Sequence, residues 1–199
     1  VLYIAYNHRF EKNFIKMKNL IGEKKLGKIY FCRIFYGNGT SDLVKKNKWK
    51  NDQKGVLLDI GSHMLDLLIF WFNTPEFKNI KIQQKISFES KSPDYGIITM
   101  NINKIFINIE VSLCMWKNTF TCDLIGEAGS AHINSLCKWS DSEFIIRKRI
   151  MPSGLPIEKK QIIKFGDNTW KDEIKFFKKL INNRKRSYSY LEKEILINN

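Results

Sequence analysis

Apolar residues recur along this chain with two different periods, and the period changes near Pro75. Before that proline, residues 11–23 and 59–70 carry apolar side chains at the three-to-four-residue spacing of a helix. Short apolar runs that are typical of buried strands lie at residues 1–6 and 28–36. The first part of the chain therefore predicts strands and helices in alternation.

After Pro75 the period is two, as in KIFINIEVSL, which predicts half-buried strands joined by short antiparallel links such as WKN and GEAGS. Residues 151–166 are expected to be irregular, and helices are expected at 168–182 and from about Tyr188. The predicted strands are 77–88, 96–102, 104–115, 118–125, 130–136 and 143–150. The fold class that follows is α+β: a large, mostly antiparallel sheet with helices, including 59–72 and 168–182, packed on one face.

Between the strand at 28–36 and the helix at 59–70 lies a polar, turn-rich stretch, residues 37–55. We expect it to be a loop of roughly twenty residues, a length that inside a compact domain is often functional.

Charge and cysteine content exclude several classes of protein. The 199 residues have a net charge of +14, but the lysines are spread along the chain and the densest clusters, 45–48 and 184–186, lack interleaved aromatic residues. No run approaches the ~18 apolar residues of a membrane span. The four cysteines form no CxxC pair, which indicates a reducing compartment. We expect a cytoplasmic protein that binds neither nucleic acid nor membrane.

Three ionisable residues interrupt the apolar helix predicted near residue 60: Asp59, His63 and Asp66. Burying unpaired charge is costly, so each needs a compensating partner or a function. Residues four apart on a helix project to the same side, which would place the Asp59 carboxylate beside the His63 imidazole. A carboxylate in that position can orient the ring and stabilise its protonated form, as acid–base chemistry requires.

A structural interpretation fits the same spacing, and from spacing alone it is the better supported. Asp59 or Ser62 would cap the helix, and His63 would be a core histidine with its hydrogen bonds satisfied. A metal site is not expected, because no second histidine lies nearby in sequence. Gly55 and Gly61 leave room for a close approach of another backbone at the start of the helix.

Two further motifs have competing interpretations. Asn7, His8 and Arg9 follow an apolar strand-like run, a position where ligands often bind in α/β proteins, although sequence alone favours a solvated turn with Phe10 packed on the next helix. The GEAGSA stretch at 126–131 lacks the full GxGxxG spacing and precedes a strand-like run, so it predicts a hairpin turn and not a nucleotide-binding loop.

Taken together, these segments resemble the C-terminal domain of the Gfo/Idh/MocA oxidoreductases, the glucose-fructose oxidoreductase and inositol dehydrogenase family. AYNHRF is similar to the strand that leaves the nucleotide-binding domain, and WKNDQKGVLLDIGSHMLDLL is similar to the central Asp-x-Gly-x-His-x-x-Asp signature. DLIGEAGSAHI and WKDEIKFFKKLINN are similar to a sheet hairpin and a closing helix. The resemblance implies that residues 1–7 are the last strand or linker of a Rossmann domain and that 8–199 form one substrate-binding and oligomerisation domain.

The resemblance also implies a reaction, in which hydride moves between a sugar or polyol carbon and NAD or NADP. His63 falls on the family's acid–base position, and Asp59 falls on a carboxylate that positions the substrate or the imidazole. Asn7, Arg9 and Trp49 fall on segments that border the substrate cleft. The implied partners are a sugar, nucleotide-sugar or polyol substrate and further copies of the same chain, paired through the open sheet face.

Two departures from the family pattern change the expectation for this chain. The family's catalytic lysine, in a Glu-Lys-Pro motif, and its cofactor domain lie upstream of the matched segments, and Lys54 replaces a usual glycine. We therefore expect NAD(P) to be bound mainly by another domain and not by this chain alone, which would then be inactive by itself. The alternative is a binding or oligomerisation module that keeps the fold without the chemistry.

Overall fold

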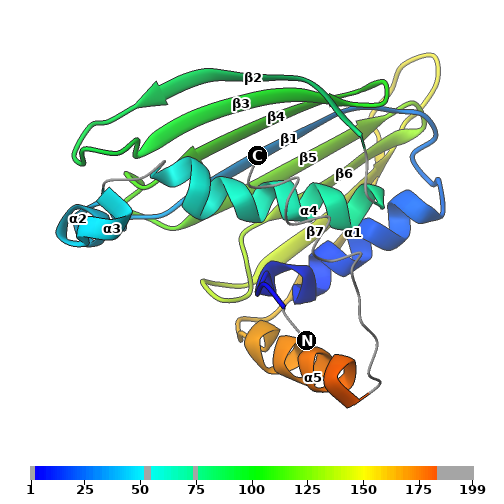
Figure 1. Ribbon diagram of the computed structural model, residues 1–199. Helices are drawn as coiled ribbons and strands as arrows, with labels where there is room; N and C mark the ends of the chain where they lie inside the picture. Colours follow the sequence, from blue (N-terminus) through cyan, green and yellow to red (C-terminus); the bar gives the residue numbers. More distant parts are fainter. Residues whose placement is uncertain (1–2, 52–54, 74–75, 183–199) are drawn as a thin grey trace.

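The computed structural model describes residues 3–51, 55–73 and 76–182, with the backbone alone at 49 and 50. They form an eight-stranded sheet with helices against one face (Figure 1). The helical segments are η1 (Asn7–Phe10), α1 (Lys12–Gly22), α2 (Ser41–Lys46), α3 (Lys48–Asn51), η2 (Leu57–Gly61), α4 (Ser62–Phe72) and α5 (Thr169–Asn182). The strands are β1 (Ile29–Gly37), β2 (Phe77–Ile86), β3 (Tyr95–Ile102), β4 (Ile105–Ser112), β5 (Thr119–Gly126), β6 (Gly129–Asn134), β7 (Ser142–Lys148) and β8 (Ile157–Ile163).

The strand order across the sheet is β2-β3-β4-β1-β5-β6-β7-β8. Every neighbouring pair is antiparallel except β1 and β4, which run parallel. β1 comes first in the sequence, yet it lies between two antiparallel groups that are made later. The predicted α+β fold with a large, mostly antiparallel sheet is confirmed.

The core lies between the sheet and the helices α1 and α4. Because α4 is apolar around most of its circumference, it is largely enclosed: Met64, Leu67 and Leu68 have no exposed surface. Phe14 of α1 packs edge-on against Trp71 of α4, and the Trp71 indole N–H donates to the Phe14 carbonyl at 3.0 Å. Burial of side chains this large contributes roughly 1.5–3 kcal/mol each. No helix in the described ranges is long and apolar enough to cross a membrane.

The predicted helices and strands are present to within a few residues, and the differences lie in the irregular stretches. Residues 3–6 form no strand and lead directly into η1. The loop predicted at 37–55 contains the short helices α2 and α3. Residues 157–163, predicted to be irregular, form β8, because β7 offers an edge that pairs with them along its whole length. The helix predicted near Tyr188 lies outside the described residues, and the domain boundary after residue 7 remains a prediction.

The predicted helix at 168–182 is present as α5, but it packs on the N-terminal segment and is set apart from the sheet (Figure 1). Asn7 donates to the Thr169 hydroxyl at 2.8 Å, and Tyr3 donates to the Glu173 carboxylate at 3.0 Å. The Tyr3 ring also stacks on Phe177, with 5.5 Å between ring centroids. α5 is therefore anchored mainly through residues that precede α1.

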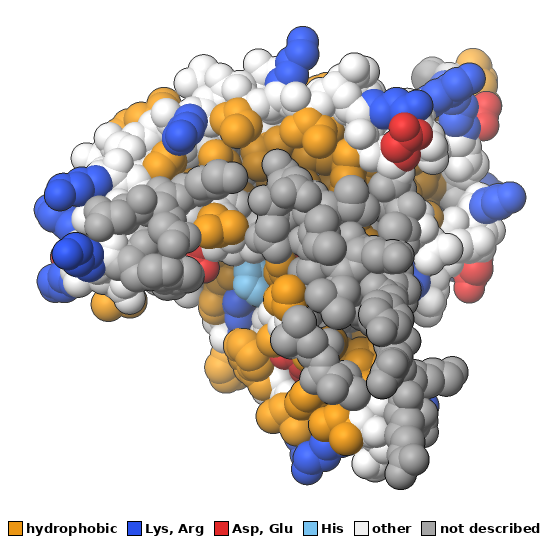
Figure 2. All heavy atoms as spheres, in the orientation of Figure 1, with side chains coloured by type: hydrophobic (Ala, Val, Ile, Leu, Met, Phe, Trp, Pro, Cys, Tyr) orange, Lys and Arg blue, Asp and Glu red, His pale blue; other side chains and the backbone are white. Residues whose placement is uncertain are grey.

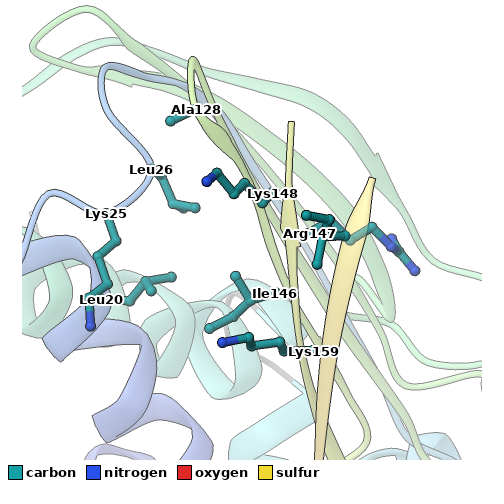
Figure 3. A pocket seen from close by; sticks show the side chains of 9 residues that line it. Leu20, Lys25, Leu26, Ala128, Ile146, Arg147, Lys148 and Lys159 are labelled. Atoms are coloured by element: carbon teal, nitrogen blue, oxygen red, sulfur yellow. The ribbon is translucent and has the colours of Figure 1, made fainter. Parts of the chain in front are cut away.

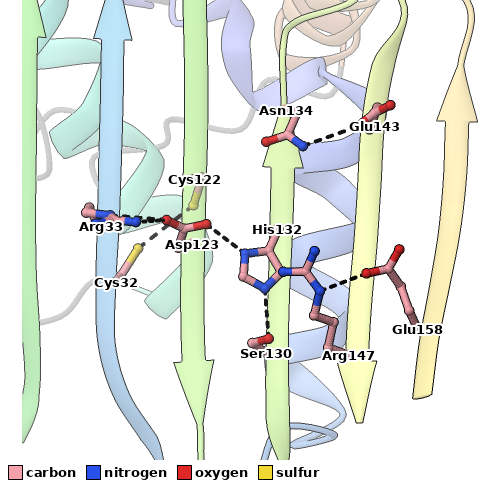
Figure 4. A network of polar contacts seen from close by, with 10 residues as sticks. All are labelled: Cys32, Arg33, Cys122, Asp123, Ser130, His132, Asn134, Glu143, Arg147 and Glu158. Carbon is pink, nitrogen blue, oxygen red and sulfur yellow. Dashed lines mark hydrogen bonds and ion pairs between the residues drawn. The ribbon is translucent and has the colours of Figure 1, made fainter. Parts of the chain in front are cut away.

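The opposite face of the sheet carries a row of polar contacts across β1, β5 and β6 (Figure 4). Arg33 donates to Asp123 at 2.6 Å, the same carboxylate lies 2.7 Å from His132 Nδ1, and Ser130 lies 2.8 Å from His132 Nε2. The contacts to His132 and Arg33 lower the pKa of Asp123 to about 2. We call these four residues the Asp123 network.

All four cysteines are free thiols. Cys32 and Cys122 lie on the neighbouring strands β1 and β5, with their sulfur atoms 4.0 Å apart (Figure 4).

Candidate functional site

His63 lies in the first turn of α4, directly after the π-helical turn η2. A π-helical turn is wider than an α-helical one, and such turns occur frequently at functional sites. Because η2 includes Asp59, the angle between Asp59 and His63 differs from that of an α-helix. Gly55 precedes this turn with φ +54°, and a Cβ there would lie 2.0 Å from the Pro93 carbonyl oxygen, which confirms the predicted close approach. A Cβ at Gly61 would meet only ordinary contacts, so that part of the prediction is wrong.

The described hydrogen bond of the His63 ring joins it to His8 of η1. Nδ1 of His63 and Nδ1 of His8 are 3.0 Å apart, and the two ring planes cross at 74°. On its other side, His8 Nε2 lies 3.2 Å from Nζ of Lys138, which also donates to the Tyr36 hydroxyl at 2.9 Å. Four residues from distant parts of the sequence thus form one continuous line, which we call the histidine–lysine chain: His63, His8, Lys138 and Tyr36.

Burial and charge hold both of these histidines in the neutral form at neutral pH. Burial, helped by the positive charge of Lys138, lowers the pKa of His63 to about 4, and the nearby Asp59 carboxylate only partly opposes this. The pKa of His8 lies well below its usual range for the same two reasons, burial first. Burial also lowers the pKa of Lys138. Imidazole surface is accessible in the middle of the helical side of the molecule, beside hydrophobic side chains (Figure 2).

Arg9 and Asp66 form an ion pair inside the fold. Asp66 is 1% exposed, and the Arg9 guanidinium donates to both of its oxygens, through Nε at 2.7 Å and through Nη2. A bidentate pair of this kind neutralises the charge of a buried carboxylate and gives each of its oxygens a hydrogen bond. The pair explains how α4 tolerates a charge on its buried side, and it places Arg9 against α4.

The predicted site residues occupy different surroundings. Asn7 is 4% exposed and bonded to Thr169, whereas Asp59 is half-buried and lines a cavity of about 370 Å³. The other residues lining this cavity are Asn38, Thr40, Leu43, Val44 and Asn47. Trp49 lies in α3, and its side chain is outside the described part of the structure. Asp59 thus acts on His63 through its charge, and it adjoins a cavity that is lined in part by amide and hydroxyl groups.

A second cavity, of about 410 Å³, lies at the end of α1, and no histidine is among the described residues that line it (Figure 3). Lysine side chains and apolar residues surround it, and Arg147 points away from it towards the other face of the sheet. Within the described ranges, no three His, Cys, Asp or Glu residues gather as metal ligands would.

Sequence reasoning missed two members of the histidine–lysine chain. Lys138 follows β6 and Tyr36 lies near the end of β1, so neither is close to His63 in sequence, and a single lysine among many carries no signal. His8 belongs to the NHRF segment, but its contact with His63 depends on how η1 packs against α4. Only the three-dimensional arrangement brings these residues together.

The sequence model of the GFO/IDH/MocA C-terminal domain matches residues 14–132. Over 110 residues, the chain is 24% identical to scyllo-inositol 2-dehydrogenase (NADP(+)) IolW of Bacillus subtilis (strain 168), a match that covers 53% of this chain and 29% of that protein.

Solved structures share the fold at low sequence identity. A putative NADPH-dependent oxidoreductase from Desulfitobacterium hafniense DCB-2 matches with TM-score 0.74 and 17% identity, covering 91% of this chain and 55% of that one. Levoglucosan dehydrogenase in complex with NADH and levoglucosan matches with TM-score 0.65 and 17% identity, covering 83% and 47%. An inositol dehydrogenase homologue from Azotobacter vinelandii, in complex with NADH and myo-inositol, matches with TM-score 0.60 and 19% identity, covering 82% and 42%.

The chain spans less than a third of its curated relative and about half of these solved chains. The domain model, the antiparallel sheet with its parallel β1–β4 pair, and the Asp-x-Gly-x-His-x-x-Asp segment at the start of α4 agree with one another. This chain belongs to the GFO/IDH/MocA C-terminal domain family.

Proposed function

We propose that this chain is the substrate-binding half of an NAD(P)-dependent sugar or polyol dehydrogenase. Its family supports this assignment, as do the relatives described as a scyllo-inositol dehydrogenase, a levoglucosan dehydrogenase and an inositol dehydrogenase homologue. The observation that carries the proposal is His63, a half-buried imidazole under the charge of the Asp59 carboxylate, which itself lines a polar cavity.

The oxidation of an alcohol removes a hydride from carbon and a proton from oxygen. The dinucleotide accepts the hydride, so this chain must manage the proton and position the hydroxyl. His63 is neutral at neutral pH, because its pKa is lowered to about 4, and a neutral imidazole can accept a proton. The negative charge of Asp59 raises the proton affinity of the ring and so opposes part of the effect of burial.

The cavity beside Asp59 is the proposed place for the substrate's hydroxyl groups. Amide, hydroxyl and carboxylate groups from Asn38, Thr40 and Asp59 line it, and such groups both donate and accept hydrogen bonds. These are the partners that a sugar or polyol needs when it leaves water.

The dinucleotide itself belongs, in this proposal, to a separate nucleotide-binding domain. A pyrophosphate site of the usual kind needs a glycine loop that opens a helix. The glycine-containing GEAGSA stretch instead forms the hairpin between β5 and β6, as predicted. We therefore propose that this chain contributes the substrate-binding site and the proton acceptor. The separate nucleotide-binding domain would bind the dinucleotide.

The test is His63→Ala in the intact enzyme, with the nucleotide-binding domain present. Loss of a general acid–base group lowers turnover by ~10²–10⁴-fold. Asp59→Asn should lower turnover as well, because the imidazole then loses a nearby charge that raises its proton affinity. His132→Gln is the matched control, because His132 lies on the opposite face of the sheet and should leave turnover unchanged.

Melting temperature and turnover are measured on the same samples. If His63→Ala melts at a lower temperature but turns over normally per folded molecule, His63 is a core histidine and the proposal fails. The chain would then be better described as a binding or oligomerisation module.

A further inference from the structure

The histidine–lysine chain fixes where each of its protons must lie. A protonated lysine has only N–H donors, so Lys138 requires His8 Nε2 to accept. Neutral His8 then carries its proton on Nδ1 and donates it to His63 Nδ1, 3.0 Å away. His63 Nδ1 is thereby an acceptor, and neutral His63 must hold its own proton on Nε2. No hydrogen bond to Nε2 is formed within the described part of the chain, which leaves that nitrogen for a ligand.

We propose that His8 and Lys138 act as positioning residues that set the tautomer of His63 and relay its proton between the substrate site and Lys138. The inference rests on the proposed dehydrogenase function for its catalytic consequence, while the tautomer can be observed without any reaction.

In both directions of the reaction, each histidine in the relay gains one proton for every proton that it loses. When a carbonyl is reduced, His63 gives its Nε2 proton to the substrate oxygen and takes the Nδ1 proton of His8. His8 in turn takes a proton on Nε2 from Lys138, which becomes a neutral amine. Alcohol oxidation starts from the state that this reduction leaves, with Lys138 as a neutral amine and no proton on His63 Nε2. Each transfer then reverses: His63 Nε2 takes the hydroxyl proton, His63 Nδ1 returns a proton to His8 Nδ1, and His8 Nε2 returns one to Lys138, which ends as an ammonium ion. Every bond in this sequence is an N–H or O–H bond, so the relay needs no further oxidant or reductant.

The surroundings of Lys138 suit the end of a relay. Its ammonium lies 4.9 Å from the Trp139 ring centroid and 5.4 Å from that of Tyr36, and the carboxylates of Glu11 and Asp167 act on it through their charge. No described carboxylate forms an ion pair with it. A paired lysine would hold its proton tightly, whereas this half-buried one can release a proton and recover one from solvent.

The first experiment reads the tautomer of His63 by ¹⁵N NMR on this chain. We expect the proton on Nε2 in the wild type and a mixture of tautomers in His8→Phe and in Lys138→Met. Lys138→Arg should keep the wild-type tautomer, because arginine still donates to His8. A wild-type proton on Nδ1, or a tautomer unchanged by His8→Phe, overturns the proposal.

The second experiment measures turnover in the intact enzyme. Arginine keeps the charge and the donor but cannot release a proton, so Lys138→Arg should lower turnover at least ~10-fold although the tautomer is preserved. Full turnover in Lys138→Arg overturns the relay. If the arginine variant fails to fold, solvent isotope effects replace it: the wild type should show more than one proton in flight and His8→Phe only one, and a single proton in the wild type overturns the relay.

These outcomes separate the two proposals. Normal turnover in His63→Ala removes the proposed function but leaves the tautomer result intact. A large loss in His63→Ala together with normal turnover in Lys138→Arg keeps the function and removes the relay.

Discussion

At the scale of single residues, Asp66 explains how a charge can lie inside an apolar helix. Its carboxylate is 1% exposed and receives two N–H donors from Arg9. Because water cannot solvate this carboxylate, the guanidinium must compensate for its charge. The same pair fixes η1 against α4 and so holds His8 next to His63.

Arg9→Met should therefore destabilise the fold. Removing one partner of a buried ion pair costs about 3–5 kcal/mol, since the other charge stays buried. Urea unfolding measures the change, and the double variant Arg9→Met/Asp66→Leu should recover much of the loss. If the double variant is as unstable as the single one, the uncompensated charge is not the cause.

The assignment of Arg9 as a substrate-binding residue stays a prediction. A raised KM in an Arg9 variant that folds normally would support it.

Gly55 and Gly61 form a natural comparison. Gly55→Ala should lower the free energy of unfolding by at least about 1–2 kcal/mol, because φ is +54° and the new Cβ would meet the Pro93 carbonyl. Gly61→Ala should be neutral or stabilising by up to about 1 kcal/mol, since its Cβ has room in a helical turn. Thermal melting of both variants checks the prediction, which fails if they respond alike.

Sequence reasoning at this scale succeeded where the partners lie close in the chain. The DIGSHMLD segment placed Asp59 where its charge acts on His63, although their catalytic roles stay a prediction, and the glycine at position 55 indicated a close approach. It failed where a partner is distant: neither the Arg9–Asp66 pair nor the Lys138–His8 contact has a local signal. Such contacts depend on how η1 and the loop after β6 meet, which no short-range pattern encodes.

At the scale of elements, the Asp123 network ties β1, β5 and β6 together on the open face of the sheet. Hydrogen bonding by His132, followed by that from Arg33, lowers the pKa of Asp123 to about 2, below the usual value of about 3.9. A carboxyl group with a lowered pKa stabilises the folded state fully above its unfolded value and loses that contribution as pH falls towards its folded value.

Asp123→Asn should consequently be less stable than the wild type near pH 6, and the difference should shrink as pH falls from about 4 to about 2. Urea unfolding at several pH values measures the difference. Asp42→Asn is the control, because Asp42 is an exposed member of an i,i+4 pair with Lys46 on α2 and should show a smaller effect. A difference between Asp123→Asn and the wild type that is constant with pH would contradict the assignment.

Element boundaries show which physical signals a sequence carries. Periodicity identified α1, α4 and the strands β2 to β7, because burial on one face imposes it directly. β8 was not predicted from the sequence. Nearly all of its residues are exposed, so the segment IEKKQII has no apolar face, and it forms a strand only because it pairs with β7. The π-helical turn η2 was equally invisible, since its apolar residues also suit an α-helix.

At the scale of the whole molecule, the open sheet face is the proposed surface for pairing between copies. Phe31 and Phe106 lie opposite each other on the parallel strands β1 and β4 and are 39% and 48% exposed. Exposed aromatic residues on a sheet face are typical of interfaces, and closed dimers are the commonest assembly. The Asp123 network occupies the neighbouring strands of the same face, so the proposed interface would combine apolar and polar contacts.

Phe106→Lys should shift the chain from dimer to monomer, because a new charge would be buried against its counterpart in the partner. Sedimentation velocity at micromolar concentration measures the shift. Ile174→Lys on α5 is the control: this residue is 54% exposed but lies on the side of the helices, and its substitution should leave the dimer intact. A wild-type chain that sediments as a monomer would refute the proposed assembly.

The central position of β1 has a consequence for synthesis of the protein. β1 leaves the ribosome before either neighbour exists, since β4 and β5 begin only at Ile105 and Thr119. At about 5–20 residues per second, the nascent strand IYFCRIFYG keeps both edges unpaired for several seconds. Unpaired backbone N–H and C=O groups at a strand edge are templates for wrong pairing, so during this interval the apolar strand is prone to aggregation. The sheet is completed around β1, the strand that is synthesised first. Its two halves can join only if β1 stays free of wrong pairing until β4 and β5 have been synthesised.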